Sequence, residues 1–192
     1  MPAYRALLYK YYHPDCPPDN ETFKEYLDNN IITVGWPPLK VQSNGVLQYA
    51  RAHSISETAR YCQNSGLVAG DITIQPSFRA WIFLAKAEPG NIIVARYSDG
   101  RHKICVVESR LDAINALAIP NAVKNKIDQI YNGSFRDLSF GMHVRSCGLI
   151  MNHAVNDKLN DYWSRRSRQR HALIDIEIYN PGNDFGFTAT HV

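Results

Sequence analysis

Two β-branched segments on either side of a short turn constrain the fold of this chain most strongly. Residues 92–97 (IIVARY) and 103–108 (KICVVE) flank Ser98-Asp99-Gly100. Asp-Gly sequences favour the backbone conformations that tight hairpin turns need, so the pattern predicts an antiparallel hairpin. The apolar character of both segments is continuous rather than alternating, which indicates a sheet that is covered on both faces.

Weaker patterns predict helices and further strands around this hairpin. The Pro- and Asx-rich residues 13–22 indicate a loop, after which Thr22 is expected to cap a short helix over 23–27. The other expected elements are strands over 31–34 and 174–178, a helix from the capping box Ser54-Ile55-Ser56-Glu57 to about Cys62, and helices over 121–131 and 154–163.

These elements predict an α+β fold built around a small curved β-barrel with flanking helices. A length of 192 residues suits one domain. We assign residues 1–180 to this domain, including a basic C-terminal element over 145–180. The Gly-, Asn- and Thr-rich residues 181–192 are expected to form a loosely ordered tail.

Composition excludes several classes of protein. Apolar residues make up 45% and charged residues 20% of the chain, values typical of globular rather than disordered domains. The longest apolar run, Ala80–Ala85, is too short for a transmembrane helix, and the N-terminus lacks the pattern of a signal peptide. The four dispersed cysteines form no CxxC pair and give no support for a zinc site. We expect free thiols in a reducing compartment, the cytoplasm or, in a eukaryote, the nucleus.

Two blocks of sequence resemble a known superfamily. The first is Ile31–Trp36 (IITVGW), and the second is Phe78–Phe83 (FRAWIF) followed by Glu88–Ala95 (EPGNIIVA). The first block is similar to the strand followed by Trp with which PUA-like domains begin. The second is similar to the W-x-F … x-x-G-D-x-V pattern of these domains, which forms a strand, a turn and a second strand. The resemblance is to the EVE- and YTH-related members found with modification-dependent restriction systems, and its best-matching part is 31–109.

The resemblance implies a small β-barrel that holds a nucleobase flipped out of a strand, in many cases a modified base. Stacking of a base on aromatic rings is worth about 1–3 kcal/mol per base, and short polar groups can then read the edge of the base. The residues that the resemblance places in this base-binding pocket are Trp36, Trp81, Phe78, Thr33 and Asn91. The alternative is that the Trp and Phe rings belong to the core and that Asn91 favours the turn.

Positive charge is concentrated toward the C-terminus. Residues 145–171 carry six basic residues against two acidic ones, a surplus of four, whereas the whole chain has a net charge of +3. Guanidinium forks fit phosphate oxygens, and Tyr162 and Trp163 add rings suited to splayed bases. The alternative is a solvated charged surface. The candidate phosphate-binding residues are Arg145, Arg165, Arg166, Arg168 and Arg170.

The motifs of common enzymes are missing from the sequence. It contains no Gly-x-Ser-x-Gly, P-loop or Gly-x-Gly-x-x-Gly pattern, so we predict no catalytic residues, no cofactor and no metal. The leading hypothesis is a non-catalytic module that binds nucleic acid, DNA or RNA, with a separate effector or defence protein as a second partner. The alternative is a protein-interaction module on the same fold, for example a phage or mobile-element protein that blocks a defence complex. A third hypothesis is a metal-dependent nuclease that uses His143 and His153.

Overall fold

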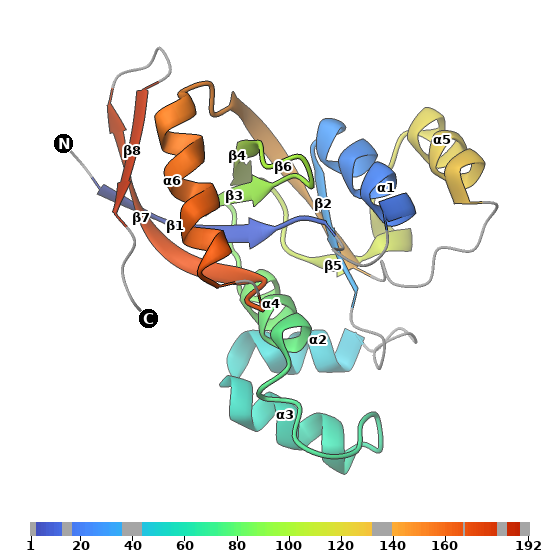
Figure 1. Ribbon diagram of the computed structural model, residues 1–192. Helices are drawn as coiled ribbons and strands as arrows, with labels where there is room; N and C mark the ends of the chain where they lie inside the picture. Colours follow the sequence, from blue (N-terminus) through green and yellow to red (C-terminus); the bar gives the residue numbers. More distant parts are fainter. Residues whose placement is uncertain are drawn as a thin grey trace.

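The computed structural model describes residues 3–12, 17–35, 44–131, 140–166, 168–179 and 184–188, and it shows a mixed α+β fold (Figure 1). The strands are β1 (Ala3–Lys10), β2 (Ile31–Val34), β3 (Ile92–Arg96), β4 (His102–Val107), β5 (Asp112–Ala113), β6 (Phe140–Leu149), β7 (His171–Tyr179) and β8 (Asp184–Thr188). The helices are α1 (Pro17–Asp28), α2 (Asn44–Ala52), α3 (Ile55–Asn64), α4 (Pro76–Ala85), α5 (Asn121–Tyr131) and α6 (His153–Ser164), with a 3₁₀ turn over Ile114–Ala116. None of the helices in these ranges is long and apolar enough to span a membrane.

The strands form one sheet in the order β2-β6-β4-β3-β1-β7-β8, and β5 pairs with β6. β1 and β3 are parallel, and every other pair is antiparallel. β2 and β8 lie at the two ends of this order, and no pairing joins them within the described residues. The predicted α+β class is therefore confirmed, whereas the sheet is not closed into a barrel.

Alternating side chains divide the core between the two faces of the sheet. On β1, Leu7 and Tyr9 belong to a large cluster that includes residues of α1 to α5. Leu8 points to the other face, where it packs in a smaller cluster with Leu159 and Trp163 of α6. Figure 1 shows α6 lying across β1 and β7. The prediction that both faces of the central strands are covered is confirmed.

The predicted hairpin is confirmed as β3 and β4, with Ile92 opposite Val106 and Arg96 opposite His102. In its turn, the Asp99 carboxylate accepts a hydrogen bond from the backbone N–H of Arg101 at 3.0 Å. Gly100 has a φ of +87°, and a Cβ at this position would lie 3.2 Å from the side-chain amide of Asn160 in α6. The left-handed backbone conformation therefore favours glycine here, and α6 leaves little room for a Cβ.

Several other predicted elements are confirmed. The strands over 31–34 and 174–178 are β2 and part of β7, and the helices over 121–131 and 154–163 are α5 and α6. The capping box is also present: the Ser54 hydroxyl accepts from the Glu57 N–H at 3.2 Å, and the Glu57 carboxylate accepts from the Ser54 N–H at 2.8 Å. α3 therefore begins where the sequence predicts.

Two segments are helical where the sequence predicts otherwise. The second block of the family resemblance is not a strand over 78–83 but lies in α4, which has Pro76 in its first turn. A continuous apolar run is equally compatible with a buried helix, and Pro at the first helical position favours one. α1 begins at Pro17, so the predicted loop is wrong over 17–22, and the predicted cap Thr22 is a buried residue within the helix. Residues 13–16 lie outside the described residues.

Part of the predicted loose tail is a strand. β8 pairs antiparallel with β7, with Asp175 opposite Thr188 and Tyr179 opposite Asp184. Because an unpaired edge of β7 offers hydrogen-bonding groups along its length, a polar segment can extend the sheet without an apolar pattern of its own. Residues 184–188 of the predicted tail thus form a strand, and its residues 181–183 and 189–192 lie outside the described residues.

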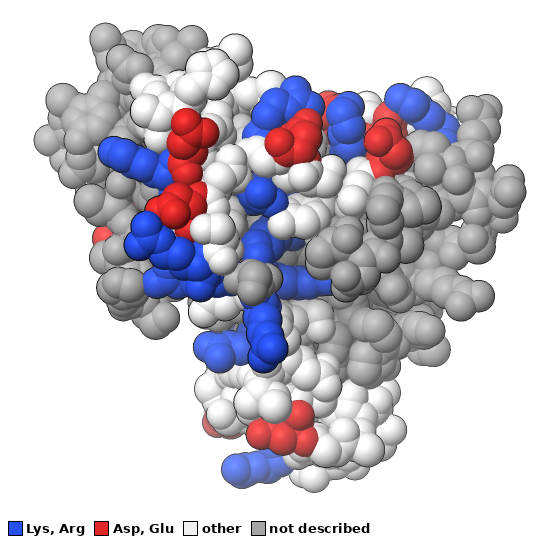
Figure 2. All heavy atoms as spheres, viewed as in Figure 1, with Lys and Arg blue, Asp and Glu red and all other residues white. Residues whose placement is uncertain are grey.

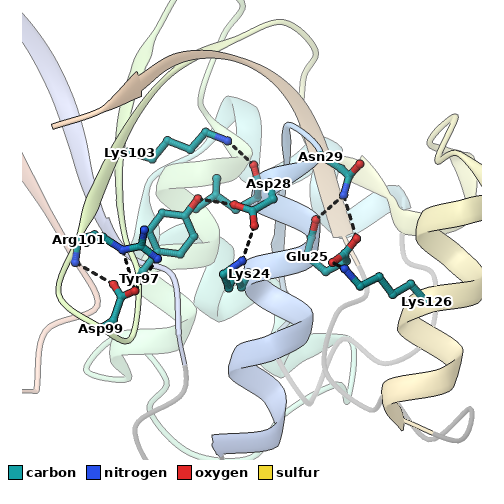
Figure 3. A network of polar contacts seen from close by, with 10 residues as sticks. Lys24, Glu25, Asp28, Asn29, Tyr97, Asp99, Arg101, Lys103 and Lys126 are labelled. Atoms are coloured by element: carbon teal, nitrogen blue, oxygen red, sulfur yellow. Dashed lines mark hydrogen bonds and ion pairs between the residues drawn. The ribbon is translucent and has the colours of Figure 1, made fainter. Parts of the chain in front are cut away.

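A polar network ties the C-terminal end of α1 to the hairpin (Figure 3). The Tyr97 hydroxyl donates to the Asp28 carboxylate at 2.9 Å, and Lys24 pairs with the same carboxylate at 2.6 Å. Lys103 of β4 donates to the backbone carbonyl of Leu27 at 2.6 Å. A cation on a terminal carbonyl is favourable because the last carbonyls of a helix lack partners within it and carry partial negative charge.

Replacement of Trp81 tests the position of α4 in the core. Trp81 and Phe78 are 0% exposed, and the Trp81 ring centroid lies 5.8 Å from that of Phe140 on β6. Trp81→Ala is expected to lower the free energy of unfolding by about 3–5 kcal/mol, because it leaves a large cavity. Urea denaturation followed by circular dichroism measures this loss. Phe83→Ala, on the half-buried side of the same helix, is the control and should lose less; a loss of under about 1 kcal/mol for Trp81→Ala contradicts a core role.

Candidate anion-binding groove

Of the five residues that the resemblance assigns to a base-binding pocket, the four that the structure describes line none of the described pockets. Trp81 and Phe78 are fully buried in α4, with ring centroids 6.3 Å apart. Neither ring presents a face to solvent, so a base has no room to stack on them in this structure. Trp36, the opposite wall of the predicted pocket, lies outside the described residues. We therefore assign Trp81 and Phe78 to the core.

The two predicted polar readers have structural partners instead. Thr33 on β2 is fully buried, its hydroxyl lies 2.7 Å from the hydroxyl of Tyr11, and its N–H donates to the same oxygen. Asn91 accepts a hydrogen bond from the Glu88 N–H at 2.9 Å and so closes the turn before β3. These contacts give both residues a structural role. Asn91 stabilises the turn, which was the alternative to base binding for this residue.

A groove with a different set of residues lies where α4 meets the end of α6 and the start of β7. It consists of two adjoining pockets of about 410 and 400 Å³, and together they form the arginine groove. The first pocket is lined by Ile74, Pro76, Arg79, Phe83, Tyr162, Arg166, Arg168, Gln169, Arg170, His171, Ala172 and Leu173. The second pocket is lined by Lys10, Tyr12, Pro76, Ser77, Arg168, Gln169 and Arg170.

Helical spacing places most of these side chains. Pro76, Arg79 and Phe83 follow one another at intervals of three and four residues, so they share one face of α4 while Phe78 and Trp81 occupy the buried face. At the end of α6, the Arg166 guanidinium lies over the Tyr162 ring, 4.2 Å from its centroid. Such stacking holds a guanidinium in place while its edge stays available to donate hydrogen bonds.

The turn between α6 and β7 is held by β1. The N–H of Gln169 donates to the Arg166 carbonyl at 2.9 Å, which closes the turn. Lys10, the last residue of β1, donates from its ammonium to the same carbonyl at 3.3 Å and from its backbone N–H to the Arg170 carbonyl at 2.9 Å. Its ammonium also lies 4.7 Å from the centroid of the Trp163 ring. The arginines after α6 therefore project from an anchored backbone.

Arginines outnumber carboxylates in the described lining of the groove. No Asp or Glu is among the described residues that line either pocket, and no ion pair within the described residues involves Arg79, Arg168 or Arg170. Figure 2 shows Lys and Arg side chains gathered around the end of α6 and the adjoining part of α4. Burial, together with the charges of Arg96 and Arg170, lowers the pKa of Lys10 to about 8. The groove is thus a site of positive potential.

His171 lines the first pocket together with these arginines. Its ring centroid lies 4.4 Å from that of Phe83, and its Nδ1 is buried with no hydrogen-bond partner among the described residues. Burial and the positive charge of Arg79 lower the pKa of His171 to about 4. The imidazole is therefore neutral at physiological pH, and its buried nitrogen has unused hydrogen-bonding capacity.

The structure divides the predicted phosphate-binding residues into two groups. Arg166, Arg168 and Arg170 line the groove. Arg165 lies outside it, 72% exposed and paired with Asp161 at 2.6 Å. Arg145 on β6 lines neither pocket and lies 3.9 Å from a carboxylate oxygen of Glu108.

A second basic surface differs from the groove in its charge balance. A depression of about 270 Å³ beside the β3–β4 hairpin contains Lys24, Arg101 and Lys103. Each of these cations has a partner within the fold, as Figure 3 shows: Asp28 for Lys24, Asp99 for Arg101 and a carbonyl of α1 for Lys103. This surface is part of the framework rather than a candidate site.

Metal chemistry has no support in the described part of the chain, which contains no group of three or more His, Cys, Asp or Glu side chains able to hold an ion. His143 lies in β6 and His153 begins α6, and they belong to no such group. Of the cysteines, Cys62 and Cys105 are buried free thiols and Cys147 is exposed and free, whereas Cys16 lies outside the described residues.

Sequence reasoning missed Lys10, Arg79, Phe83 and His171 as groove residues. The spacing of Pro76, Arg79 and Phe83 places the three residues on one face only if the segment is a helix. Because the segment was expected to be a strand, the spacing did not indicate a shared surface. Lys10 comes from the opposite end of the chain, and no local pattern indicates that β1 lies beside β7. Long-range strand pairing thus brings Lys10 to the groove.

The two histidines with lowered pKa values predict acid sensitivity. Burial lowers the pKa of His102 as well as that of His171 to about 4, while an unfolded histidine titrates near 6.5. Between these values the unfolded chain binds more protons, so stability falls as the pH falls from about 6.5 to 4. Each histidine accounts for roughly 2–3 kcal/mol of this loss.

Urea denaturation of the wild type, His171→Gln and His102→Gln across this pH range tests the assignment. Each single variant should show a shallower fall in unfolding free energy than the wild type, and each serves as the control for the other. A slope that neither substitution changes contradicts the assignment of the acid sensitivity to these two rings.

Comparison of the chain with protein-family models, curated proteins and solved structures finds no match, so the interpretation of the groove rests on its own residues.

Proposed function

We propose that this protein is a non-catalytic nucleic-acid-binding protein that holds a phosphate backbone in the arginine groove. The observation that carries the proposal is that Arg79 from α4 lines one pocket with Arg166, Arg168 and Arg170 from the α6–β7 turn, with no Asp or Glu among the described lining residues. Bringing like charges together is unfavourable, and a polyanion offsets that repulsion. Phe83 and Leu173 connect this lining to the core, whereas Arg79 is exposed on the face of α4 opposite Trp81.

The chemistry of the lining suits phosphodiesters. Guanidinium groups donate paired hydrogen bonds to phosphate oxygens, and the adjoining second pocket adds the Lys10 ammonium and the hydroxyl groups of Tyr12 and Ser77. A backbone of alternating phosphates can therefore continue from one pocket into the next. Contacts of this kind position a strand and strengthen its binding without selecting a sequence.

Aromatic residues in the first pocket provide surfaces for bases. Phe83, Tyr162 and His171 line it together with the arginines, and Phe83 and His171 are only partly buried. Stacking of an unpaired base on such rings is worth about 1–3 kcal/mol. Base contact is thus better placed on these rings than on Trp81, whose faces are covered.

Membership of the PUA-like superfamily, with a sheet curved in the manner of its small barrel, remains part of the proposal. It is supported by the two sequence blocks, within 31–36 and 78–95, and by the mixed α+β fold. The structure differs from the strand that the family pattern expects at 78–83. The arginine groove supports binding to nucleic acid independently of this resemblance.

A protein partner is the second candidate function, and one observation favours it. Ile74, at the rim of the first pocket, is 76% exposed and adjoins the arginines. Apolar residues beside arginines are a common composition at protein interfaces. An acidic protein that occupies the groove in place of nucleic acid would use both features.

Fluorescence anisotropy with short labelled DNA and RNA, single- and double-stranded, tests the proposed function. The wild type should bind at low salt with an affinity that falls steeply as salt rises. Arg168→Gln/Arg170→Gln should weaken binding by about tenfold or more and reduce the slope of log K against log salt by about one per lost phosphate contact. Arg165→Gln, a charge change of the same kind just outside the groove, is the matched control and should change affinity by less than about twofold.

Two results would contradict the proposal. Absence of binding to every oligonucleotide at low salt overturns the nucleic-acid function, and capture of an acidic protein that Arg168→Gln/Arg170→Gln releases then supports the second candidate. Binding that the double variant and Arg165→Gln weaken equally contradicts the assignment to the groove.

A further inference from the structure

The charge of the first pocket exceeds what one internal phosphate needs. Four arginines line this pocket of about 410 Å³, and no Asp or Glu is among its described lining residues. Three of the four, Arg79, Arg168 and Arg170, take part in no ion pair within the described residues. An internal phosphodiester carries one negative charge and has two non-bridging oxygens that accept hydrogen bonds. A phosphomonoester at neutral pH carries about −1.5 to −2 and has three acceptor oxygens, so it matches several guanidinium groups at once.

The arginines approach the pocket from two sides. Arg79 extends from α4, whereas Arg166, Arg168 and Arg170 belong to the turn between α6 and β7. A strip of cations along one surface would follow a continuous backbone. Cations that two separate elements supply to one small pocket can instead bind one compact anion together.

The remaining lining suits a nucleoside attached to that phosphate. The volume of about 410 Å³ lies within the range of small-ligand sites, about 300–1,000 Å³. Phe83 and Tyr162 offer ring surfaces, and the second pocket continues past Lys10 and Ser77 toward solvent. A strand can therefore place its terminal nucleotide in the first pocket and leave through the second.

We infer that the first pocket of the arginine groove binds a nucleoside phosphomonoester, in the form of the 5′-phosphorylated end of a single strand, in preference to an internal phosphodiester. The strand-end form of this inference rests on the proposed function. The same chemistry is present in a free nucleoside 5′-monophosphate, and the experiment distinguishes the two sources.

The test compares two single-stranded oligonucleotides of one sequence, each labelled at the 3′ end, one with a 5′-phosphate and one with a 5′-hydroxyl. The 5′-phosphorylated strand should bind about tenfold tighter by anisotropy, as expected for additional charge-assisted hydrogen bonds. Arg79→Gln should remove this preference, whereas Arg165→Gln should keep it. Thermal unfolding of each variant confirms that it is folded, and unlabelled adenosine 5′-monophosphate serves as the competitor.

The outcomes separate this inference from the proposed function. Equal affinity for the two strands, lowered alike by Arg168→Gln/Arg170→Gln, overturns the inference and leaves the nucleic-acid function in place. In a second outcome, adenosine 5′-monophosphate displaces the strand with an inhibition constant close to the Kd of the strand. That result shows that a free nucleotide is sufficient for binding to the pocket, and it supports the inferred recognition of a phosphomonoester. Calorimetric binding of the nucleotide without binding of either strand also supports that chemistry but overturns the proposed function. Absence of binding to all three overturns both.

Discussion

The pairing of β1 with both β3 and β7 is the constraint on which the rest of this structure depends. β1 runs parallel to β3 and antiparallel to β7, so it joins the hairpin to the C-terminal strands. Its side chains alternate between the two cores, and its last residue, Lys10, holds the turn after α6 through two hydrogen bonds. The position of the arginines therefore depends on a strand more than a hundred and fifty residues earlier in the chain.

That anchoring explains how the fold tolerates a concentrated positive charge. Two like charges 4 Å apart repel by about 1 kcal/mol in water and about 4 kcal/mol at an effective dielectric constant of about 20. Loose side chains on a mobile turn would separate to relieve this repulsion. Here the turn is fixed by Lys10, and Arg166 is stacked on Tyr162. The lowered pKa of Lys10 reflects the same field, after the larger effect of its burial. An anion in the groove would meet donors that are already in place, which lowers the entropy lost on binding.

Local patterns predicted the local elements well and the long-range arrangement poorly. The hairpin at 98–100 and the capping box at Ser54 were predictable because a few adjacent residues determine each of them. β1 has no turn signature and no clear alternation, and its neighbours are far away in sequence. The groove was half predictable for the same reason: three of its arginines form a visible cluster after α6, but Arg79 belongs to a segment interpreted as a strand. An apolar run of this length does not distinguish a buried strand from a buried helix without tertiary contacts.

The assignment of α4 as a helix changes how any variant of Trp81 must be interpreted. Trp81 faces the core and Arg79 faces the groove, on opposite sides of one short helix. Loss of the buried indole would let α4 shift or unfold locally, and Arg79 and Phe83 would move with it. Weaker binding by a Trp81 variant would therefore follow even if no base touches the indole. Substitutions of exposed groove arginines leave the core of α4 intact, so they separate recognition from stability in a way that a tryptophan substitution does not.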